Sequence, residues 1–296
     1  MPQKKIIMEE LEALNTIKDL AQSYEEIAVV RMQKIRDSVI RTRDFLSRLS
    51  DVFVDLKSSY QREVKDLLAR IKKGDKMLLP TLQKNGKSLM VYLSSNGKLY
   101  GAVTGKTFRL FMQDLKAPGA EKSDLLIIGK AGKEMFEGSS STRSFDYFEL
   151  PDTSFTIDHI KQLVSKFLQY ENVHVYYGKF GNVIRQTPIA TSITGEDVFE
   201  AETPQNVGRD DRFIFEPTLE KIYHFFETQI MANLFAQTLL ENQLARHASR
   251  VNAMEEALIH IEEEGKKLNQ MKVRLKHLMA NKKQLETISG VLFLID

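Results

Sequence analysis

The 296-residue sequence contains no cysteine. That absence excludes disulfide bonds, thiolate metal sites and cysteine nucleophiles, and it suits a reducing cytosol. Long hydrophobic runs are absent too, since none approaches the roughly 18 to 20 residues that a membrane-spanning helix needs. The opening MPQKKIIMEE lacks the apolar core of a signal peptide. We therefore expect no segment that crosses a membrane.

An excess of one charge is also missing. The 42 basic residues nearly balance the 40 acidic ones, which gives a formal net charge of +2. Such a balance exerts no overall attraction on nucleic acid or on an anionic membrane, so either partner would need a local patch. We expect no nucleic-acid partner and no direct membrane insertion. The 42% hydrophobic content suits one or two packed domains.

Proline and glycine are scarce at both ends of the chain. Six of the seven prolines and 13 of the 15 glycines lie between residues 74 and 217. Because α-helices tolerate these residues least, the ends are predicted to be helical and the middle to be rich in loops. The predicted domains are a long N-terminal helix at 1–75, a central domain at 76–216 and a long C-terminal helix at 217–296.

Apolar residues recur at heptad spacing in both helical arms, which is the pattern of a helix seam. The seam of the first arm runs through Ala28, Met32, Ile35, Val39, Thr42, Leu46, Leu49, Phe53 and Leu56. Upstream, a stripe of less strict phase passes through Leu11, Leu14, Ile17, Leu20, Tyr24 and Ile27. The weaker seam of the last arm passes through Leu244, His247, Val251, Met254, Leu258, Ile261, Gly265, Leu268, Lys272, Leu275, Met279, Lys282 and Leu285. Since both stripes need a partner, we predict that the arms form a long antiparallel coiled coil.

The middle of the chain alternates strand-like and helix-like segments. The apolar, partly β-branched runs are 88–95, 124–129 and 173–180. Helix-compatible stretches lie between them at 107–116 and 157–170. This alternation predicts a small central α/β (Rossmann-like) domain. The polar stretches 138–156 and 194–212 are expected to be exposed loops.

No catalytic or metal-binding motif is complete. The segment Gly101-Ala-Val-Thr-Gly105-Lys106-Thr107 is one residue shorter than a phosphate-binding P-loop, so its lysine is expected to face solvent after a strand-to-helix turn. The six histidines are scattered, and His247 and His277 are expected to be ordinary polar residues on a helix face. The glutamates 262–264 are typical of a solvated face. We expect no enzymatic activity, no cofactor and no metal.

Four central segments resemble the gamma subunit of F-type ATP synthases. The stretch SLMVYLSSNGKLYGAVTG is similar to the family's apolar strand followed by SSDRGLCGG, and it keeps Ser94, Ser95, Leu99 and Gly101. DLLIIGKAGKEMFE resembles the second strand, glycine turn and helix, and VHVYYGKFGNVIRQTP resembles the pair of late strands. FIFEPTLEKIYHFF resembles the start of the last helix. The order of the segments matches along nearly the whole chain.

The terminal arms match the same family in register more than in identity. The N-terminal pattern of the family falls on residues 19–32, and its C-terminal patterns fall on 244–250 and 269–274. In these segments Arg246 matches the arginine of the family, whereas Lys272 stands where the family has arginine. The resemblance implies a partner interface that includes Tyr24, Arg31, Leu99, Gly101, Arg246, Asn269 and Lys272. Arg246 is expected to occupy an exposed helix position.

The resemblance implies a central rotor shaft that couples ion-driven rotation to conformational change on partner subunits. Its implied partners are the catalytic and non-catalytic ring subunits (alpha and beta), the epsilon subunit and the membrane ion-rotor ring. Its implied location is peripheral, on the cytoplasmic face of a bacterial-type cell membrane. Two alternatives stay open: a gamma-like shaft of a rotary-type ATPase that does not pump ions, and an unrelated antiparallel coiled-coil scaffold.

Overall fold

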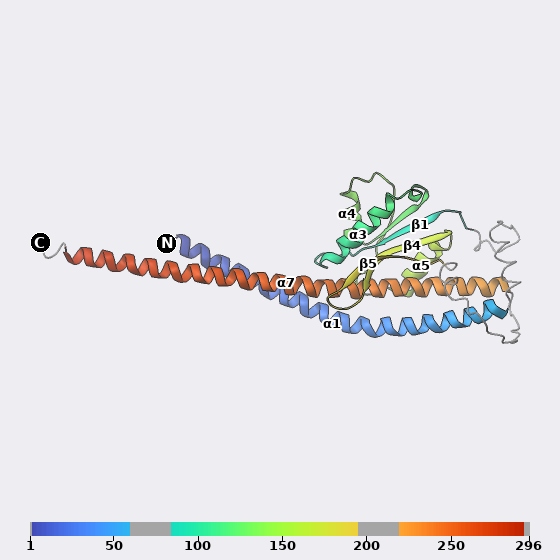
Figure 1. Cartoon of the computed structure of the whole chain (residues 1–296), viewed down its shortest axis with the longest axis horizontal. Coiled ribbons are helices and arrows are strands. Elements are labelled where there is room, and N and C mark those ends of the chain that lie inside the picture. Colours follow the sequence, from blue (N-terminus) through green and yellow to red (C-terminus); the bar gives the residue numbers. More distant parts are fainter. Residues whose placement is uncertain (1, 60–83, 195–218, 293–296) are drawn as a thin grey trace. The chain divides into compact units, whose positions relative to one another are not determined.

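A computed structural model describes residues 2–59, 84–194 and 219–292 (Figure 1). The helices are α1 (Pro2–Ser59), α3 (Ala102–Leu115), the 3-10 helix η2 (Ala120–Lys122), α4 (Lys130–Glu137), α5 (Ile157–Phe167) and α7 (Leu219–Leu292). The strands are β1 (Ser88–Leu93), β2 (Asp124–Ile128), β3 (Asp146–Phe148), β4 (Asn172–Phe180) and β5 (Gln186–Ser192). The predicted fold class, an antiparallel coiled coil of the terminal helices with a central α/β domain, is confirmed.

The chain contains two compact units. Unit 1 comprises Met1–Val29 and Arg250–Asp296, and unit 2 comprises Val30–Ser249. Both terminal helices therefore contribute to both units. The predicted domain boundaries at 75/76 and 216/217 lie outside the described residues and stay predictions. In the described part of the chain, no helix is both long and apolar enough to cross a membrane.

The sheet of unit 2 has the strand order β3-β2-β1-β4-β5. The first four strands are parallel, and β5 pairs with β4 in the antiparallel sense. The three strands predicted from apolar runs are confirmed as β1, β2 and β4. The expectation of a loop over 138–156 is wrong at β3, a strand of three residues. The expected loop at 194–212 lies outside the described residues from residue 195 onward.

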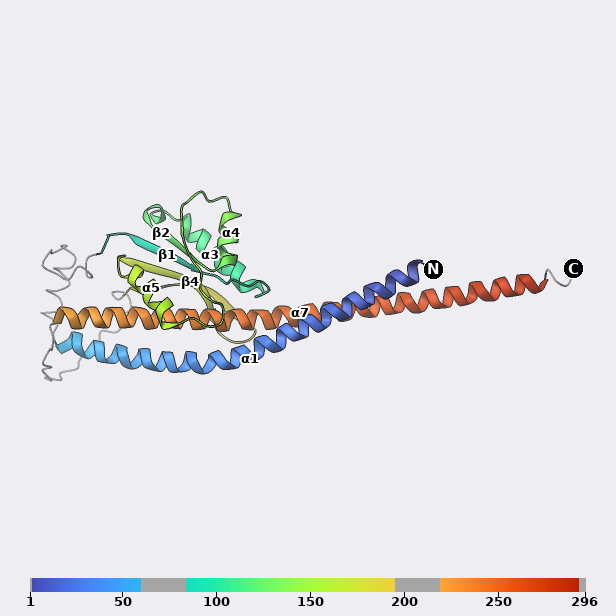
Figure 2. The same ribbon diagram turned by 180° about the vertical axis from the view of Figure 1, so that it is seen from behind.

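Helices cover both faces of this sheet (Figures 1 and 2). One core joins the sheet to α5 and α7, with Phe167 and Phe235 at van der Waals distance in an edge-to-face pair whose ring centroids are 4.9 Å apart. The opposite core joins the sheet to α3 and α4 around Phe111 and Phe136. The alternating side chains of β1 thus point into two different cores, which explains why its run is continuously apolar.

In unit 1, α1 and α7 lie side by side in opposite directions. Lys18 Nζ is 3.0 Å from Glu262 Oε1, whereas Tyr24, later in α1, lies against Arg250, earlier in α7. The seam of α7 is half-buried or buried at Val251, Met254, Leu258, Ile261, Gly265, Leu268 and Leu275. Its other unit 1 positions, Lys272, Met279, Lys282 and Leu285, are exposed.

The upstream stripe predicted for α1 is wrong after Leu14. Ile17, Leu20, Tyr24 and Ile27 are 38 to 55% exposed, and the inward positions are Lys18, Ala21, Glu25 and Ala28. The inward positions continue the heptad phase of the downstream seam, which the structure bears out from Ala28 to Leu49. Helix geometry fixes the phase of the interface, so the apolar residues one position earlier lie on its flank. Phe53 and Leu56 lie beyond the described side chains.

Candidate functional site: the junction of the last helix with the sheet domain

Helix α7 is buried at nine consecutive positions, 241–249, within unit 2. A helix has 3.6 residues per turn, so a helix packed on one side buries only about half of such a segment. Continuous burial means that neighbouring elements cover this segment on every side. The contacts described below come from α1, from the loop after β1, from the N-terminus of α3, from β4 and from the loop before α5. We call this arrangement the α7 junction.

Two glycines allow backbone to approach α7 closely. A Cβ atom at Gly178 of β4 would lie 2.7 Å from Val103 Cγ2 and 3.4 Å from Ala245 Cβ. The Gly178 N–H instead donates to Asn242 Oδ1 at 3.1 Å. Gly101, with φ of +63°, precedes α3, and a Cβ atom there would lie 2.3 Å from the Ser249 carbonyl oxygen. Gly101 therefore requires glycine because of its packing against α7, and Gly178 requires it because of its packing against Val103 of α3.

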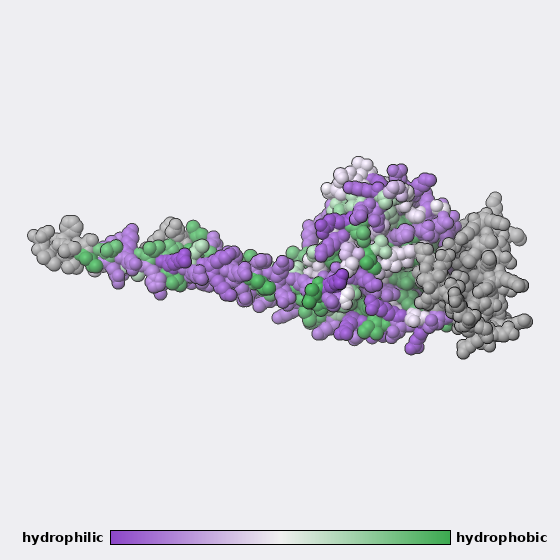
Figure 3. Space-filling view, viewed as in Figure 1, coloured by the Kyte–Doolittle hydropathy of each residue, from purple (hydrophilic) through white to green (hydrophobic). Residues whose placement is uncertain are grey.

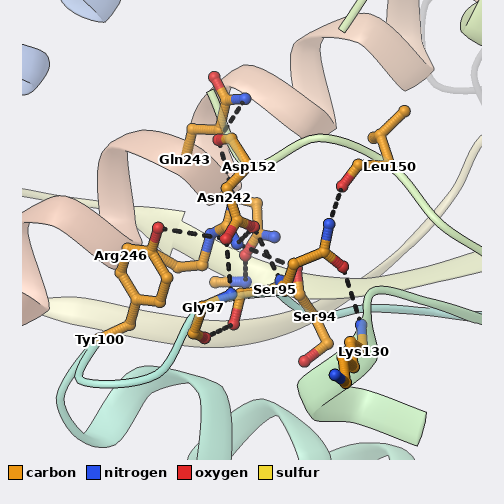
Figure 4. A network of polar contacts seen from close by, with 12 residues as sticks. Ser94, Ser95, Gly97, Tyr100, Lys130, Leu150, Asp152, Asn242, Gln243 and Arg246 are labelled. Atoms are coloured by element: carbon orange, nitrogen blue, oxygen red, sulfur yellow. Dashed lines mark hydrogen bonds and ion pairs between the residues drawn. The ribbon is translucent and has the colours of Figure 1, made fainter. Parts of the chain in front are cut away.

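Asp152, in the loop before α5, is the polar centre of the α7 junction (Figure 4). Its Oδ1 lies 2.7 Å from Arg246 Nη1 and accepts the Asn96 N–H at 3.0 Å. Its Oδ2 accepts the Gly97 N–H at 2.7 Å and the Tyr100 hydroxyl at 3.4 Å. One carboxylate therefore joins α7 to the loop that follows β1.

Arg246 reaches the same loop directly. Its Nη1 donates to the Ser94 carbonyl oxygen at 3.1 Å, and its guanidinium lies 4.9 Å from the centre of the Tyr100 ring. Gln243, one turn earlier, donates through Nε2 to the Asp152 carbonyl oxygen at 3.0 Å. Asn96 extends the network outward, because its side chain donates to Leu150 O and accepts the N–H of Lys130 at the start of α4.

The surroundings of Asp152 and Arg246 favour the charged forms of both side chains. Burial by itself raises the pKa of the Asp152 carboxyl, but the Arg246 guanidinium and the two backbone N–H donors outweigh it and hold the pKa below its ordinary value. Arg246 is only 5% exposed. The buried charge of Arg246 is tolerated because the Asp152 carboxylate pairs with it and because its N–H groups find hydrogen-bond acceptors.

A second buried acid ties α7 to α1. The Glu241 side chain is 2% exposed, and its Oε1 lies 2.7 Å from Arg43 Nη2 and 3.1 Å from Gln237 Nε2. Nearer the start of α7, Glu227 Oε1 lies 3.1 Å from the Nζ of Lys84, a residue just before β1. Ion pairs therefore connect α7 to three separate segments of unit 2.

The structure divides the expected interface residues between different surroundings. Arg246 and Gly101 belong to the α7 junction, so the expectation that Arg246 is an exposed helix residue is wrong. Leu99 is 57% exposed at φ of +65°, a rare backbone conformation for a side-chain-bearing residue. In unit 1, Asn269 and Lys272 are exposed and line one groove between α1 and α7.

Two expected interface residues lie on α1. The Tyr24 ring is half-exposed and lies 5.4 Å from the guanidinium of Arg250. Arg31 is half-buried in unit 2. The role of all seven residues in partner binding stays a prediction.

The shortened P-loop segment lies in a helix. Helix α3 begins at Ala102, so Gly105 and Lys106 are within its first two turns and Lys106 is exposed. In the first turn of α3, the Val103 N–H donates to Ser249 Oγ of α7 at 3.3 Å, so α7 already engages the start of this helix. In the residues that the structure describes, no cluster of three His, Asp or Glu side chains could hold a metal ion.

Sequence reasoning missed Asp152 and Tyr100. Both lie in loops. No motif marks Asp152, and Tyr100 lies in the stretch SLMVYLSSNGKLYGAVTG but is not one of the positions at which that stretch keeps the residues of the family. His247, expected to be an ordinary polar residue on a helix face, is 1% exposed, and its ring lies 5.8 Å from that of Tyr100 in an edge-on arrangement. Only one feature of the sequence could have indicated that residues 241–249 are buried. The segment is helical but has no continuous apolar face.

These features define a class of protein in which two long terminal helices flank an α/β domain in the sequence and the domain encloses a segment of the last helix. The family model described as ATP synthase matches residues 3–276. The chain therefore belongs to the ATP synthase family.

Its curated relatives are gamma chains of that family. It is 22% identical to the ATP synthase gamma chain of Hyphomonas neptunium over 98% of this chain and 99% of the relative. It is 29% identical to the gamma chain of Staphylococcus carnosus, over 54% of this chain and 57% of the relative. These identities mark a divergent gamma-type member.

The fold matches chains of solved ATP synthases. One is a chain from the mitochondrial ATP synthase of Euglena gracilis, described as OSCP/F1/c-ring, with a TM-score of 0.63 and 14% identity over 99% of this chain and 95% of that chain. Another comes from the central stalk/c-ring of the Tetrahymena thermophila enzyme, with a TM-score of 0.54, 17% identity and coverage of 80% and 99%. Family membership makes the unrelated scaffold alternative untenable.

Proposed function

We propose that this chain is the central rotor shaft of an F-type ATP synthase and is not itself catalytic. The observation that supports this function is the α7 junction. A helix that neighbouring elements cover on every side, and that three ion pairs hold, cannot turn independently of the sheet domain. Because α7 continues without interruption from unit 2 into unit 1, torque applied to the sheet domain passes along the helix.

Helix α1 presents unequal faces within unit 1. Ile17, Leu20, Tyr24 and Ile27 form an exposed apolar stripe, whereas Asp19 and Glu26 on the same helix are exposed acids. A partner can be shifted between two states only by contacts that differ between those states. A rotating shaft with unequal faces supplies such a difference to each surrounding subunit in turn.

The partners in this proposal are a ring of alternating alpha and beta subunits around the helices, the epsilon subunit, and the membrane ion-rotor ring. Nucleotide chemistry belongs to the ring. The chain is peripheral on the cytoplasmic face of the cell membrane. The gamma chains and the F1/c-ring and central-stalk structures that it resembles support the partners in this proposal.

The test is purification of the tagged chain from its native cells in mild detergent, followed by identification of the proteins that accompany it. We expect alpha and beta subunits together with the subunit of the membrane ring. Alpha-type and beta-type subunits without a membrane ring, after crosslinking in intact membranes, would instead favour the shaft of an ATPase that does not pump ions. Absence of both sets would reject the rotor function.

A further inference from the structure

The tripeptide Asn-Gly-Lys occurs twice in the chain, at 85–87 and at 96–98, and no other asparagine in the sequence precedes a glycine. Once the glycine nitrogen of such a pair has lost its proton, it can attack the side-chain amide of the asparagine, because glycine has no Cβ to obstruct the approach. The two copies have the same immediate chemistry. Any difference in their reactivity therefore comes from the folded structure around them.

The second copy is locked in the α7 junction, where Asn96 and Gly97 are half-buried. Asn96 Oδ1 accepts the Lys130 N–H at 2.9 Å, and Asn96 Nδ2 donates to the Leu150 carbonyl oxygen at 2.9 Å. The Gly97 N–H donates to Asp152 Oδ2 at 2.7 Å (Figure 4). A carboxylate at this distance opposes loss of the proton from the nitrogen. The side-chain amide is therefore held at both ends, and the nitrogen that would attack it stays protonated.

The first copy lies in a turn just before β1, where Asn85 and Gly86 are exposed. Gly86 has a φ of +69°, and no atom lies within 4 Å of the position of an added Cβ atom. Within the residues that the structure describes, neither the Gly86 N–H nor Asn85 Nδ2 makes a hydrogen bond. Asn85 Oδ1 accepts the Lys87 N–H at 2.9 Å. Negative charge develops on this oxygen when a nucleophile attacks the amide carbon, so the Lys87 N–H stabilises the transition state.

We propose that Asn85 is a site of spontaneous deamidation and that the fold protects Asn96 from the same reaction. The Gly86 nitrogen forms a bond to Asn85 Cγ and the Cγ–Nδ2 bond breaks. The proton of the Gly86 N–H, carried by solvent, leaves with Nδ2 as ammonia. Water then opens the cyclic imide at either of its carbonyl carbons, which gives aspartate or isoaspartate. Both products carry a carboxylate where the chain had a neutral amide.

The reaction needs solvent at the turn, because ammonia leaves and water enters. Figure 3 shows a largely hydrophilic surface over the sheet domain on the side in view. The main chain on either side of Gly86 is anchored, since the Asn85 N–H donates to Gln169 O at 2.8 Å and Lys87 O accepts the Glu171 N–H at 2.9 Å. Isoaspartate adds one methylene group to the main chain between these two hydrogen bonds, so both cannot keep their geometry.

The product also places a negative charge next to an ion pair of α7. Lys84 immediately precedes Asn85 in the sequence, and its Nζ lies 3.1 Å from Glu227 Oε1. A carboxylate at position 85 competes with Glu227 for the Lys84 ammonium group. Deamidation therefore acts on one of the ion pairs that connect α7 to the rest of unit 2.

The test incubates the purified full-length chain at neutral pH and follows both tripeptides by mass spectrometry. Digestion in mild acid, with a protease that leaves 85–87 and 96–98 in separate long peptides, prevents further reaction during the analysis. Enzymatic methylation of isoaspartate measures the second product. The same chain unfolded in guanidinium chloride is the reference, because the two copies then differ only in sequence neighbours outside the tripeptide.

We expect Asn85 to deamidate at least about tenfold faster than Asn96 in the folded chain, since freeing the Gly97 N–H from a charged acceptor lowers the rate by about this factor or more. In guanidinium chloride the two rates should be similar. Asn85→Ser should abolish the reaction at 85 and keep the turn, because a serine hydroxyl also accepts the Lys87 N–H. Asp152→Asn should accelerate the reaction at Asn96 alone.

Two results would overturn the proposal. One is an equal or faster reaction at Asn96 in the folded chain. The other is an Asn85 that stays intact in the folded chain over a time in which it reacts in guanidinium chloride. Both are measured on the parent chain, so neither depends on a variant that must fold.

Discussion

Asp152 and Arg246 are 94 residues apart in the sequence, yet Asp152 Oδ1 lies 2.7 Å from Arg246 Nη1. The carboxylate also holds the backbone after β1, and the guanidinium also reaches Ser94 and Tyr100. This pair therefore joins α7 to the loop before α5 and to the loop after β1. In the rotor that we propose, the pair lies where the sheet domain passes torque to the helix.

Acid should weaken this junction. The pKa of Asp152 is lowered in the folded chain, so its charged form stabilises the fold fully above the unfolded pKa of about 3.9. That stabilisation is lost as the pH falls through the folded pKa. Asp152→Asn should therefore reduce the difference in unfolding free energy between pH 7 and pH 3, measured with urea. Asp44→Asn, at an exposed position of α1, should leave the difference unchanged.

Arg246→Ala should destabilise unit 2 by roughly 3 to 5 kcal/mol, because it leaves the Asp152 carboxylate without its buried counter-charge. Arg246→Lys should recover only part of the loss, since an ammonium cannot reproduce the planar contact with Tyr100. Arg109→Ala, on the exposed side of α3, should change stability by no more than about 0.5 kcal/mol. Equal unfolding free energies for Arg246→Ala and Arg109→Ala would contradict the assigned role.

The sequence predicts elements better than it predicts their surroundings. The strands β1, β2 and β4 follow from short apolar runs between glycines, and the terminal helices follow from the lack of breakers. Heptad spacing, however, describes only one interface of a helix. The heptad pattern places Leu244 and His247 on the side of α7 that faces α1, and Arg246 on the opposite side. The sheet domain covers that opposite side, so Arg246 is buried as well. A second layer of packing leaves no periodic signal.

The polar centre was unpredictable for a related reason. Asp152 follows Pro151 in a stretch rich in serine, threonine and glycine, which is the composition of an exposed loop. Its partners are backbone N–H groups and a residue of the last helix. Only the folded topology brings them together.

The two glycines of the shortened P-loop segment should respond oppositely to alanine. At Gly101 a Cβ atom would meet the Ser249 backbone at 2.3 Å, and the backbone lies at φ of +63°, so Gly101→Ala should destabilise the chain by about 1 to 3 kcal/mol. At Gly105, inside α3, nothing lies within 4 Å of the added atom. Gly105→Ala should stabilise by up to about 1 kcal/mol. Thermal unfolding of both variants measures the contrast, and equal shifts would contradict the close approach of Gly101 to α7.

The seam of α1 in unit 2 can be tested with two neighbouring residues. Val39 is 3% exposed and Ile40 is 47% exposed, although both are β-branched and lie in the same turn. Val39→Asp should cost about 2 to 5 kcal/mol of unfolding free energy, because it buries a carboxylate among apolar groups without a partner. Ile40→Asp should stay within about 0.5 kcal/mol of the parent. Both variants introduce the same residue into the same helical turn, so equal losses in chemical denaturation would show that the seam does not face α7.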